Sequence, residues 1–159
     1  MKSEYICRVA APKDIPMVAQ LSSDWENENN CRGYLGNEED YLSGFRIFVA
    51  EAEGKVIGYI FGAAETSKDM GAIMPDNSTY FEIEELYIKP AYRSQGIGSA
   101  LMRHLENTLA AEDIDKIVLS TATKDYKRIL HFYIDEMGMS FWSAKLFKEL
   151  KKQENCDLL

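Results

Sequence analysis

The stretch that decides the fold is Arg93-Ser94-Gln95-Gly96-Ile97-Gly98. It follows a strand-like run over residues 80–89 and precedes a run with helical spacing that starts at Ile97. A turn of this kind suits a phosphate, because the first helical N–H groups lack partners within the helix and the macrodipole leaves partial positive charge there. Gly96 and Gly98 permit close approach to the backbone, and Arg93 adds a positive charge. The stretch therefore predicts a site for a phosphate-bearing cofactor.

The better-known glycine motifs do not fit this stretch. The chain has no Gly-x-x-x-x-Gly-Lys-Ser/Thr string, and Gly98 is followed by Ser99, Ala100 and Leu101 rather than by the third glycine of a dinucleotide fingerprint. The pattern is Arg-x-x-Gly-x-Gly. Taken alone, this hexapeptide is equally compatible with a plain turn between a strand and a helix.

The flanking residues carry more information. Upstream stands Phe81-Glu82-Ile83-Glu84-Glu85-Leu86-Tyr87-Ile88-Lys89-Pro90-Ala91-Tyr92, and downstream stands Phe132-Tyr133-Ile134-Asp135-Glu136-Met137-Gly138-Met139. Together with the glycine turn, these segments resemble the GNAT superfamily of acyl-CoA-dependent N-acyltransferases over about residues 80–150. The N-terminal half is similar in layout only. The resemblance implies an α+β fold with α/β/α layers, in which helices flank a mixed central β-sheet.

The same resemblance implies acetyl-CoA as the cofactor and assigns residues to it. The strand residues Leu86, Tyr87 and Ile88 would lie along pantetheine, with the N–H of Leu86 facing the acetyl carbonyl. The pyrophosphate would sit on the loop and helix start, which are Arg93, Ser94, Gln95, Gly96, Ile97, Gly98 and Ser99. Tyr126 stands where the family often has an asparagine that contacts pantetheine. No metal site is expected.

Acyl transfer to an amine requires a neutral nucleophile and a proton for the departing thiolate. Glu84 is the first candidate for the general base and Glu82 the second, and the alternative is that both simply solvate the strand. Strand alternation predicts that Glu82 and Glu84 share a face while Glu85 points the other way. By its register in Phe-Tyr-x-x-x-Gly-Met, Tyr133 resembles the family tyrosine that protonates the thiolate, although its spacing also suits core packing.

The coarse secondary structure fits this reading. The chain shows no repeat and no linker, and we expect one domain over residues 1–159. Expected strands cover 5–9, 47–52, 56–61, 80–89, 116–122 and 140–150, and the fifth of these is expected to be buried on both faces. Expected helices cover 14–28, a short segment from 38, 96–113 and 124–137. Residues 64–79 form a long loop.

Composition narrows the class of protein. Hydrophobic residues make up 46% and charged residues 28%, which is ordinary for a globular chain. Three dispersed cysteines, the lack of an apolar N-terminal signal and the lack of a spanning run favour a cytoplasmic protein without a membrane partner. The formal charge of −8 argues against a nucleic-acid surface.

We therefore expect an acetyl-CoA-dependent N-acetyltransferase that acts by direct attack in a ternary complex on a primary amine, in particular a small cationic one. Acidic residues gather between Asp24 and Asp40 and again at Glu82–Glu85, which suits a cation. The alternatives are a protein N-terminal or lysine acetyltransferase and a non-catalytic CoA-binding sensor domain. The apolar stretch from Phe141 to Leu150 would suit the edge of a homodimer.

Overall fold

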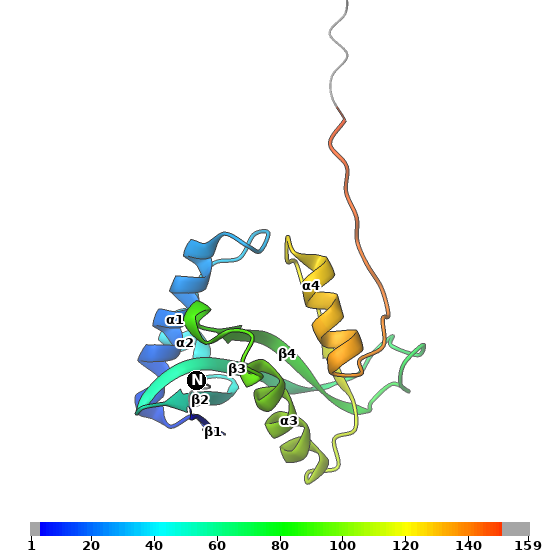
Figure 1. Cartoon of the computed structure of the whole chain (residues 1–159). Helices are drawn as coiled ribbons and strands as arrows, with labels where there is room; N and C mark the ends of the chain where they lie inside the picture. Colours follow the sequence, from blue (N-terminus) through cyan, green and yellow to red (C-terminus); the bar gives the residue numbers. More distant parts are fainter. Residues whose placement is uncertain (1–3, 151–159) are drawn as a thin grey trace, which may run out of the picture.

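Five strands form one mixed sheet in the order β1-β2-β3-β4-β5 in the computed structural model, which describes residues 4–150 (Figure 1). The strands are β1 (Ile6–Val9), β2 (Arg46–Ala52), β3 (Lys55–Thr66), β4 (Thr79–Ile88) and β5 (Ile117–Leu119). The first four strands pair antiparallel, and β5 runs parallel to β4. The sequence predicted a mixed sheet. In the observed order β4 lies between β3, which belongs to the N-terminal part of the chain, and β5, which belongs to the C-terminal part.

The helices cover both faces of the sheet. They are α1 (Ile15–Glu28), α2 (Glu39–Leu42), α3 (Ile97–Ala110) and α4 (Tyr126–Leu130), and α4 continues into the π-helical segment η3 (His131–Glu136). Two short 3-10 turns, η1 (Pro12–Asp14) and η2 (Pro90–Tyr92), precede α1 and α3. The expected helix over 124–137 is therefore present, but its second half widens from α-helical to π-helical geometry.

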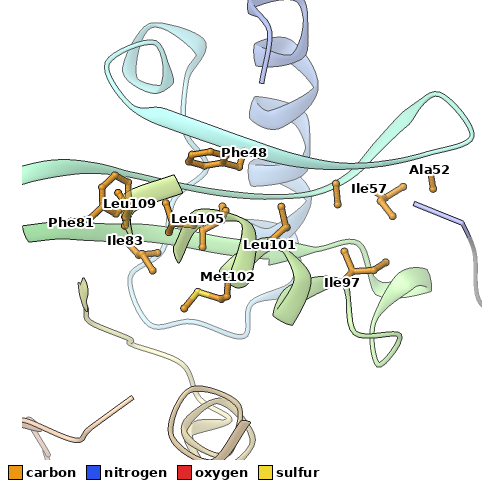
Figure 2. Close-up of a cluster of buried hydrophobic side chains, with 12 residues drawn as sticks. Phe48, Ala52, Ile57, Phe81, Ile83, Ile97, Leu101, Met102, Leu105 and Leu109 are labelled. Carbon is orange, nitrogen blue, oxygen red and sulfur yellow. The ribbon is translucent and has the colours of Figure 1, made fainter. Parts of the chain in front are cut away.

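Two hydrophobic clusters hold the layers together, because alternate side chains of the central strands point to opposite faces. One cluster packs the α3 residues Ile97, Leu101 and Leu105 against Phe48 and Phe81, and Figure 2 shows these side chains between the helix and the sheet. The other packs α1 and α2 against the opposite face and consists of Val18, Leu21, Leu42, Ile47, Val49, Val56, Tyr59, Phe61 and Tyr87. The layered α+β prediction is confirmed.

A β-bulge in β4 changes which carboxylates share a face. Phe61 lies opposite Glu85 and Gly62 lies opposite Ile83, so Glu84 is the extra residue. A Cβ on Gly62 would lie 2.0 Å from the carbonyl oxygen of Glu82, so only glycine fits beside the bulge. Strict alternation was the wrong assumption here: Glu82 and Glu85 face the same side, and Glu84 stands at the bulge.

The C-terminal part of the sheet is shorter than expected. β5 pairs with β4 only from Phe81 to Ile83, after which β4 continues to Ile88 paired with β3 alone. The β5 residues are half-buried rather than buried on both faces, because only β4 adjoins the strand. Residues 140–150 form no strand and are exposed, which corrects the prediction of a final strand there. A strand is stable only beside a partner, and this segment has none in the single chain.

Candidate active site

A cavity of about 670 Å³ opens where β4 diverges from β5. Its volume is within the range usual for small-molecule and cofactor sites. Its walls come from β4, the start of α3, the segment after β5, the helical segment α4–η3, and residues 30–34 of the loop after α1. The cavity therefore lies where the two strands diverge, and it brings residues that the sequence predicted for the cofactor beside residues 30–34 of the loop after α1.

The start of α3 forms one wall of this cavity. Gly96 caps the helix at φ +84°, a conformation that residues with a Cβ rarely adopt. Ser94 is also left-handed, at φ +60°. A Cβ on Gly98 would lie 3.5 Å from the Phe132 ring, in ordinary contact, and both residues line the cavity. The first N–H groups of α3 therefore border an open space beside a residue without a side chain, as an anion site at a helix N-terminus requires.

Arg93 is fixed by three contacts within the protein. Its Nη2 donates to Glu28 Oε1 at 2.7 Å, its Nε donates to the Ile88 carbonyl at 2.8 Å, and its guanidinium lies 5.4 Å from the centre of the Tyr87 ring. Tyr87 also donates its hydroxyl to Glu28 Oε1 at 2.7 Å. Burial raises the pKa of Glu28, but the bonds from Arg93 and Tyr87 outweigh it and leave the pKa lowered. This ion pair ties the glycine loop to the end of α1.

Glu84 is the proposed base that reaches the cavity. It lines the cavity and is exposed, whereas Glu82 does not line it and accepts a hydrogen bond from the Tyr80 hydroxyl at 3.2 Å. Partial burial raises the pKa of Glu84, and the charges of Glu82 and Glu65 add to the shift. A raised carboxyl pKa brings a base closer to neutral pH, where proton transfer is most effective.

Glu85 is a cavity residue whose environment the sequence did not reveal. It is 9% exposed. Its Oε2 accepts from the Tyr59 hydroxyl at 2.7 Å and from the Tyr34 hydroxyl at 3.0 Å, and Oε1 accepts from Asn37 Nδ2 at 2.5 Å. Desolvation raises the pKa of Glu85 despite these three donors. Strict strand alternation predicted that Glu85 faces away from Glu82, but the bulge at Glu84 puts both on the same side.

Tyr133 lines the cavity from η3, and Cys31 lines it from the loop after α1. Burial raises the pKa of Tyr133 to about 12, and the charge of Cys31 acts in the same direction. The phenol therefore keeps its proton at neutral pH, as a proton donor must. Its ring also packs at the rim of the α3 cluster, so both roles weighed for this residue from the sequence are compatible with its position.

The structure brings most of the sequence-predicted residues together. Those that line the cavity are Glu84, Leu86, Tyr87, Ile88, Arg93, Ser94, Gly96, Ile97, Gly98, Ser99 and Tyr133. Glu82, Gln95 and Tyr126 do not line it, and Tyr126 is 57% exposed. The acidic residues between Asp24 and Asp40 do not line it either: that region contributes Trp25 and residues 30–34. The acidic lining residues are Glu84, Glu85 and Glu136.

Comparisons with known proteins agree with this fold. A family model described as the acetyltransferase (GNAT) family matches residues 15–139. An aminoglycoside acetyltransferase from an uncultured soil metagenomic sample, solved in complex with sisomicin, is 18% identical with a TM-score of 0.68 and aligns over 92% of this chain and 97% of its own. A predicted acetyltransferase from Clostridium acetobutylicum, solved with acetyl-CoA, is 18% identical with a TM-score of 0.66 over 93% and 96% of the two chains.

An acetyltransferase from Trypanosoma brucei is 17% identical with a TM-score of 0.65, over 92% of this chain and all of its own. At these identities the likeness of the three structures concerns the fold, and the family model covers both halves of the cavity. Within residues 4–150, none of the helices has the length and apolar character that crossing a membrane requires.

Proposed function

This chain belongs to the GNAT acetyltransferase family, and from that premise we propose that it transfers an acetyl group from acetyl-CoA to the primary amine of a small cationic acceptor. Family membership makes it an acyltransferase. The observation that carries the finer proposal is one continuous cavity that contains a glycine-bearing helix start, a carboxylate at a β-bulge and a protonated phenol. These are the groups that binding, deprotonation and leaving-group protonation require.

The residues of the cavity fit acetyl-CoA. The start of α3 offers unpaired N–H groups and the helix dipole to a pyrophosphate, and Gly98 leaves room there. Arg93 and Arg128 add positive charge to the lining. Between the bulge and Ile88, the β4 edge that faces β5 has no strand partner, so its backbone is available to an extended amide chain such as pantetheine. When bound, acetyl-CoA supplies the acetyl thioester and a thiol leaving group.

We assign one step of the acetyl transfer to each of three groups of the chain. Glu84 takes a proton from the acceptor ammonium, directly or through a water, which leaves the amine lone pair free to attack. With acetyl-CoA bound, the backbone N–H of Leu86 would donate a hydrogen bond to the thioester carbonyl oxygen, where negative charge develops. Tyr133 donates its phenolic proton to the departing sulfur. Proximity within the ternary complex provides a large share of the rate, because the reacting atoms are held together.

Electrostatics support a cationic acceptor. The chain carries a formal charge of −8, and Glu84, Glu85 and Glu136 lie in the cavity wall. The wall also holds Arg32, Arg93 and Arg128, of which Arg93 is paired with Glu28 and Arg128 with Asp125. A structurally similar protein is named an aminoglycoside acetyltransferase and was solved with sisomicin. We therefore assign polyamines and aminoglycosides as the acceptor class to examine first.

An amine panel with acetyl-CoA, read out as released thiol, tests this proposal. Polyamines and aminoglycosides should give higher kcat/KM than neutral or anionic amines, and their KM should rise with ionic strength as salt screens the field. A preference for acidic amines without salt dependence would overturn the acceptor class. A preference for peptide amines would indicate a protein acetyltransferase, and acetyl-CoA binding without turnover on any amine would indicate a sensor domain.

A further inference from the structure

Among residues 4–150 two carboxylates are buried, and only one of them is paired with a cation. Asp14 is 5% exposed and accepts from Arg8 Nη1 at 2.7 Å and from Arg8 Nη2 at 3.0 Å. Glu85 is 9% exposed, and no lysine, arginine or histidine in the described part of the chain forms an ion pair with it. The arginines that line the same cavity have other partners, which are Glu28 for Arg93, Asp125 for Arg128 and the Phe147 ring for Arg32. Because buried charges in proteins are normally paired, Glu85 is one half of an ion pair.

Glu85 can accept one more hydrogen bond. Its present donors are all neutral: the hydroxyls of Tyr59 and Tyr34 on Oε2 and the Asn37 amide on Oε1. An ionised carboxylate accepts about four hydrogen bonds, so Oε1 has capacity for a second donor. Burial outweighs the three neutral donors and raises the pKa of Glu85. An ammonium group would supply a further donor and the opposite charge together.

Aromatic rings surround the approach to Glu85 from the cavity. Trp25, Tyr34 and Tyr87 line the cavity with Glu85, and the Trp25 ring centre lies 4.4 Å from that of Tyr34 and 5.6 Å from that of Tyr87. Ring faces attract cations and cover alkyl chains. A carboxylate beside aromatic faces is therefore suited to an alkylammonium group.

The loop after α1 holds this wall in place. At one end the Tyr34 hydroxyl donates to Glu85 on β4. At the other end the Arg32 N–H donates to the Ala122 carbonyl and the Lys124 N–H donates to the Asn30 carbonyl, each at 2.9 Å. The loop thus spans the gap between β4 and the segment after β5, where Figure 1 shows it beside the start of α4. The groups around Glu85 are fixed by the protein itself, which lowers the entropic cost of binding a ligand there.

We propose that Glu85 binds a second ammonium group of the acceptor, so that the preferred acceptor is a linear diamine. This inference rests on the proposed function, in which Glu84 serves the reacting amine. Glu84 and Glu85 are consecutive, but Glu84 is the extra residue of the bulge, so the two carboxylates are available to different ends of one molecule. Because Glu85 is nine-tenths buried, it suits the end of an unbranched alkyl chain better than a substituted ring.

The ratio of kcat/KM for diaminobutane to that for aminobutanol tests the proposal. The two amines have the same chain length and differ in the charge of the distal group. Wild type should prefer the diamine roughly ten- to a hundredfold, the range expected for a hydrogen bond to a charged group. Glu85→Gln should bring the ratio close to one. A general loss of activity cancels in this ratio, because both amines use the same base, thiolate donor and cofactor.

Asp24→Asn is the matched control. It removes the same unit of charge from α1 at a residue that does not line the cavity, and it should keep the wild-type ratio. A second measurement needs no variant: in a series from diaminopropane to diaminohexane, the preference of wild type for the diamine over the amino alcohol should peak at one chain length. Equal kcat/KM for diamine and amino alcohol at every length would overturn the proposal, as would a preference that survives in folded Glu85→Gln.

Calorimetric titration of diaminobutane into the CoA-bound protein distinguishes this proposal from the proposed function. Diamine binding that is lost in Glu85→Gln, without acetyl transfer to any amine, would support the ammonium site and overturn the reaction. Acetyl transfer to amines without any preference for diamines would overturn the ammonium site and leave the reaction in place.

Discussion

The proposed cofactor side and the proposed acceptor side of the cavity are built in different ways. On the cofactor side, β4, the glycine loop and α3 follow one another along residues 79–110, so neighbouring residues in sequence are neighbours in the wall. On the acceptor side, Tyr34, Tyr59 and Glu85 meet from three separate segments through hydrogen bonds to one carboxylate. The first side is a local structure, whereas the second exists only when distant elements are packed. The two sides should therefore respond differently to substitution.

The largest effect is expected at Tyr133, which stands between the two sides. Tyr133→Phe keeps the ring and its packing but removes the proton donor. Turnover should fall by roughly 10²–10⁴-fold, as is usual for a general acid, with little change in the affinity for acetyl-CoA. Steady-state kinetics and calorimetric titration check both parts. Near-normal turnover under conditions where chemistry limits the rate would leave Tyr133 with packing as its only role.

Glu84 and Glu82 should differ in their effect on rate, because only Glu84 lines the cavity. Glu84→Gln should lower kcat by about 10²-fold and should remove the acidic limb of the pH–rate profile, whose pKa lies above the usual glutamate range. Glu82→Gln is the matched control and should keep that limb, slightly shifted because one neighbouring charge is lost. If Glu82→Gln has the larger effect, the base assignment is reversed.

Substitution of Gly98 tests the proposed cofactor side alone. A Cβ at this position meets only ordinary contacts, so Gly98→Ala and Gly98→Val should both fold. The larger valine should fill the space beside the helix start and weaken acetyl-CoA binding at least tenfold, about 1.4 kcal/mol, with alanine between it and wild type. Calorimetry on variants with unchanged circular dichroism decides the matter. If a folded Gly98→Val protein binds acetyl-CoA as tightly as wild type does, the pyrophosphate does not bind at this site.

The contrast between the two sides also explains what the sequence could predict. The glycine turn, its strand and its helix were all identified, since each depends on residues within a few positions of one another. The face of Glu85 was not, because one extra residue at the bulge reverses the alternation and depends on the pairing of β4 with β3. The role of Arg93 was only partly seen, because its partner Glu28 is 65 residues away. A strand was predicted over residues 140–150 from propensity, but propensity does not supply a partner strand.

The smallest expected effect is on the free energy of unfolding. It distinguishes the two residues, because the pKa of Glu28 is lowered whereas the pKa of Glu85 is raised. The pKa of Glu28 is lowered, so its carboxylate stabilises the fold above the unfolded pKa, and this contribution is lost as pH falls through the folded pKa. The pKa of Glu85 is raised, so the native state holds a proton that the unfolded state releases, and stability declines as pH rises through that window.

Urea unfolding of Glu28→Gln and Glu85→Gln from about pH 7 to about pH 2 measures both contributions against wild type, because the Glu28 window lies below the ordinary glutamate pKa. Glu28→Gln should be less stable at pH 7 by about 1 kcal/mol, and this deficit should shrink on acidification. Glu85→Gln can keep both tyrosine bonds if the Asn37 amide turns over, and wild type should gain stability relative to it as pH falls. Glu85→Ala would remove the carboxylate to which the buried Tyr59 hydroxyl donates and should lose about 1–3 kcal/mol at every pH. For each variant, the difference in unfolding free energy from wild type is plotted against pH. If the two plots have the same slope, Glu28 and Glu85 have similar environments, and the contacts of Glu85 do not set the proposed acceptor side apart.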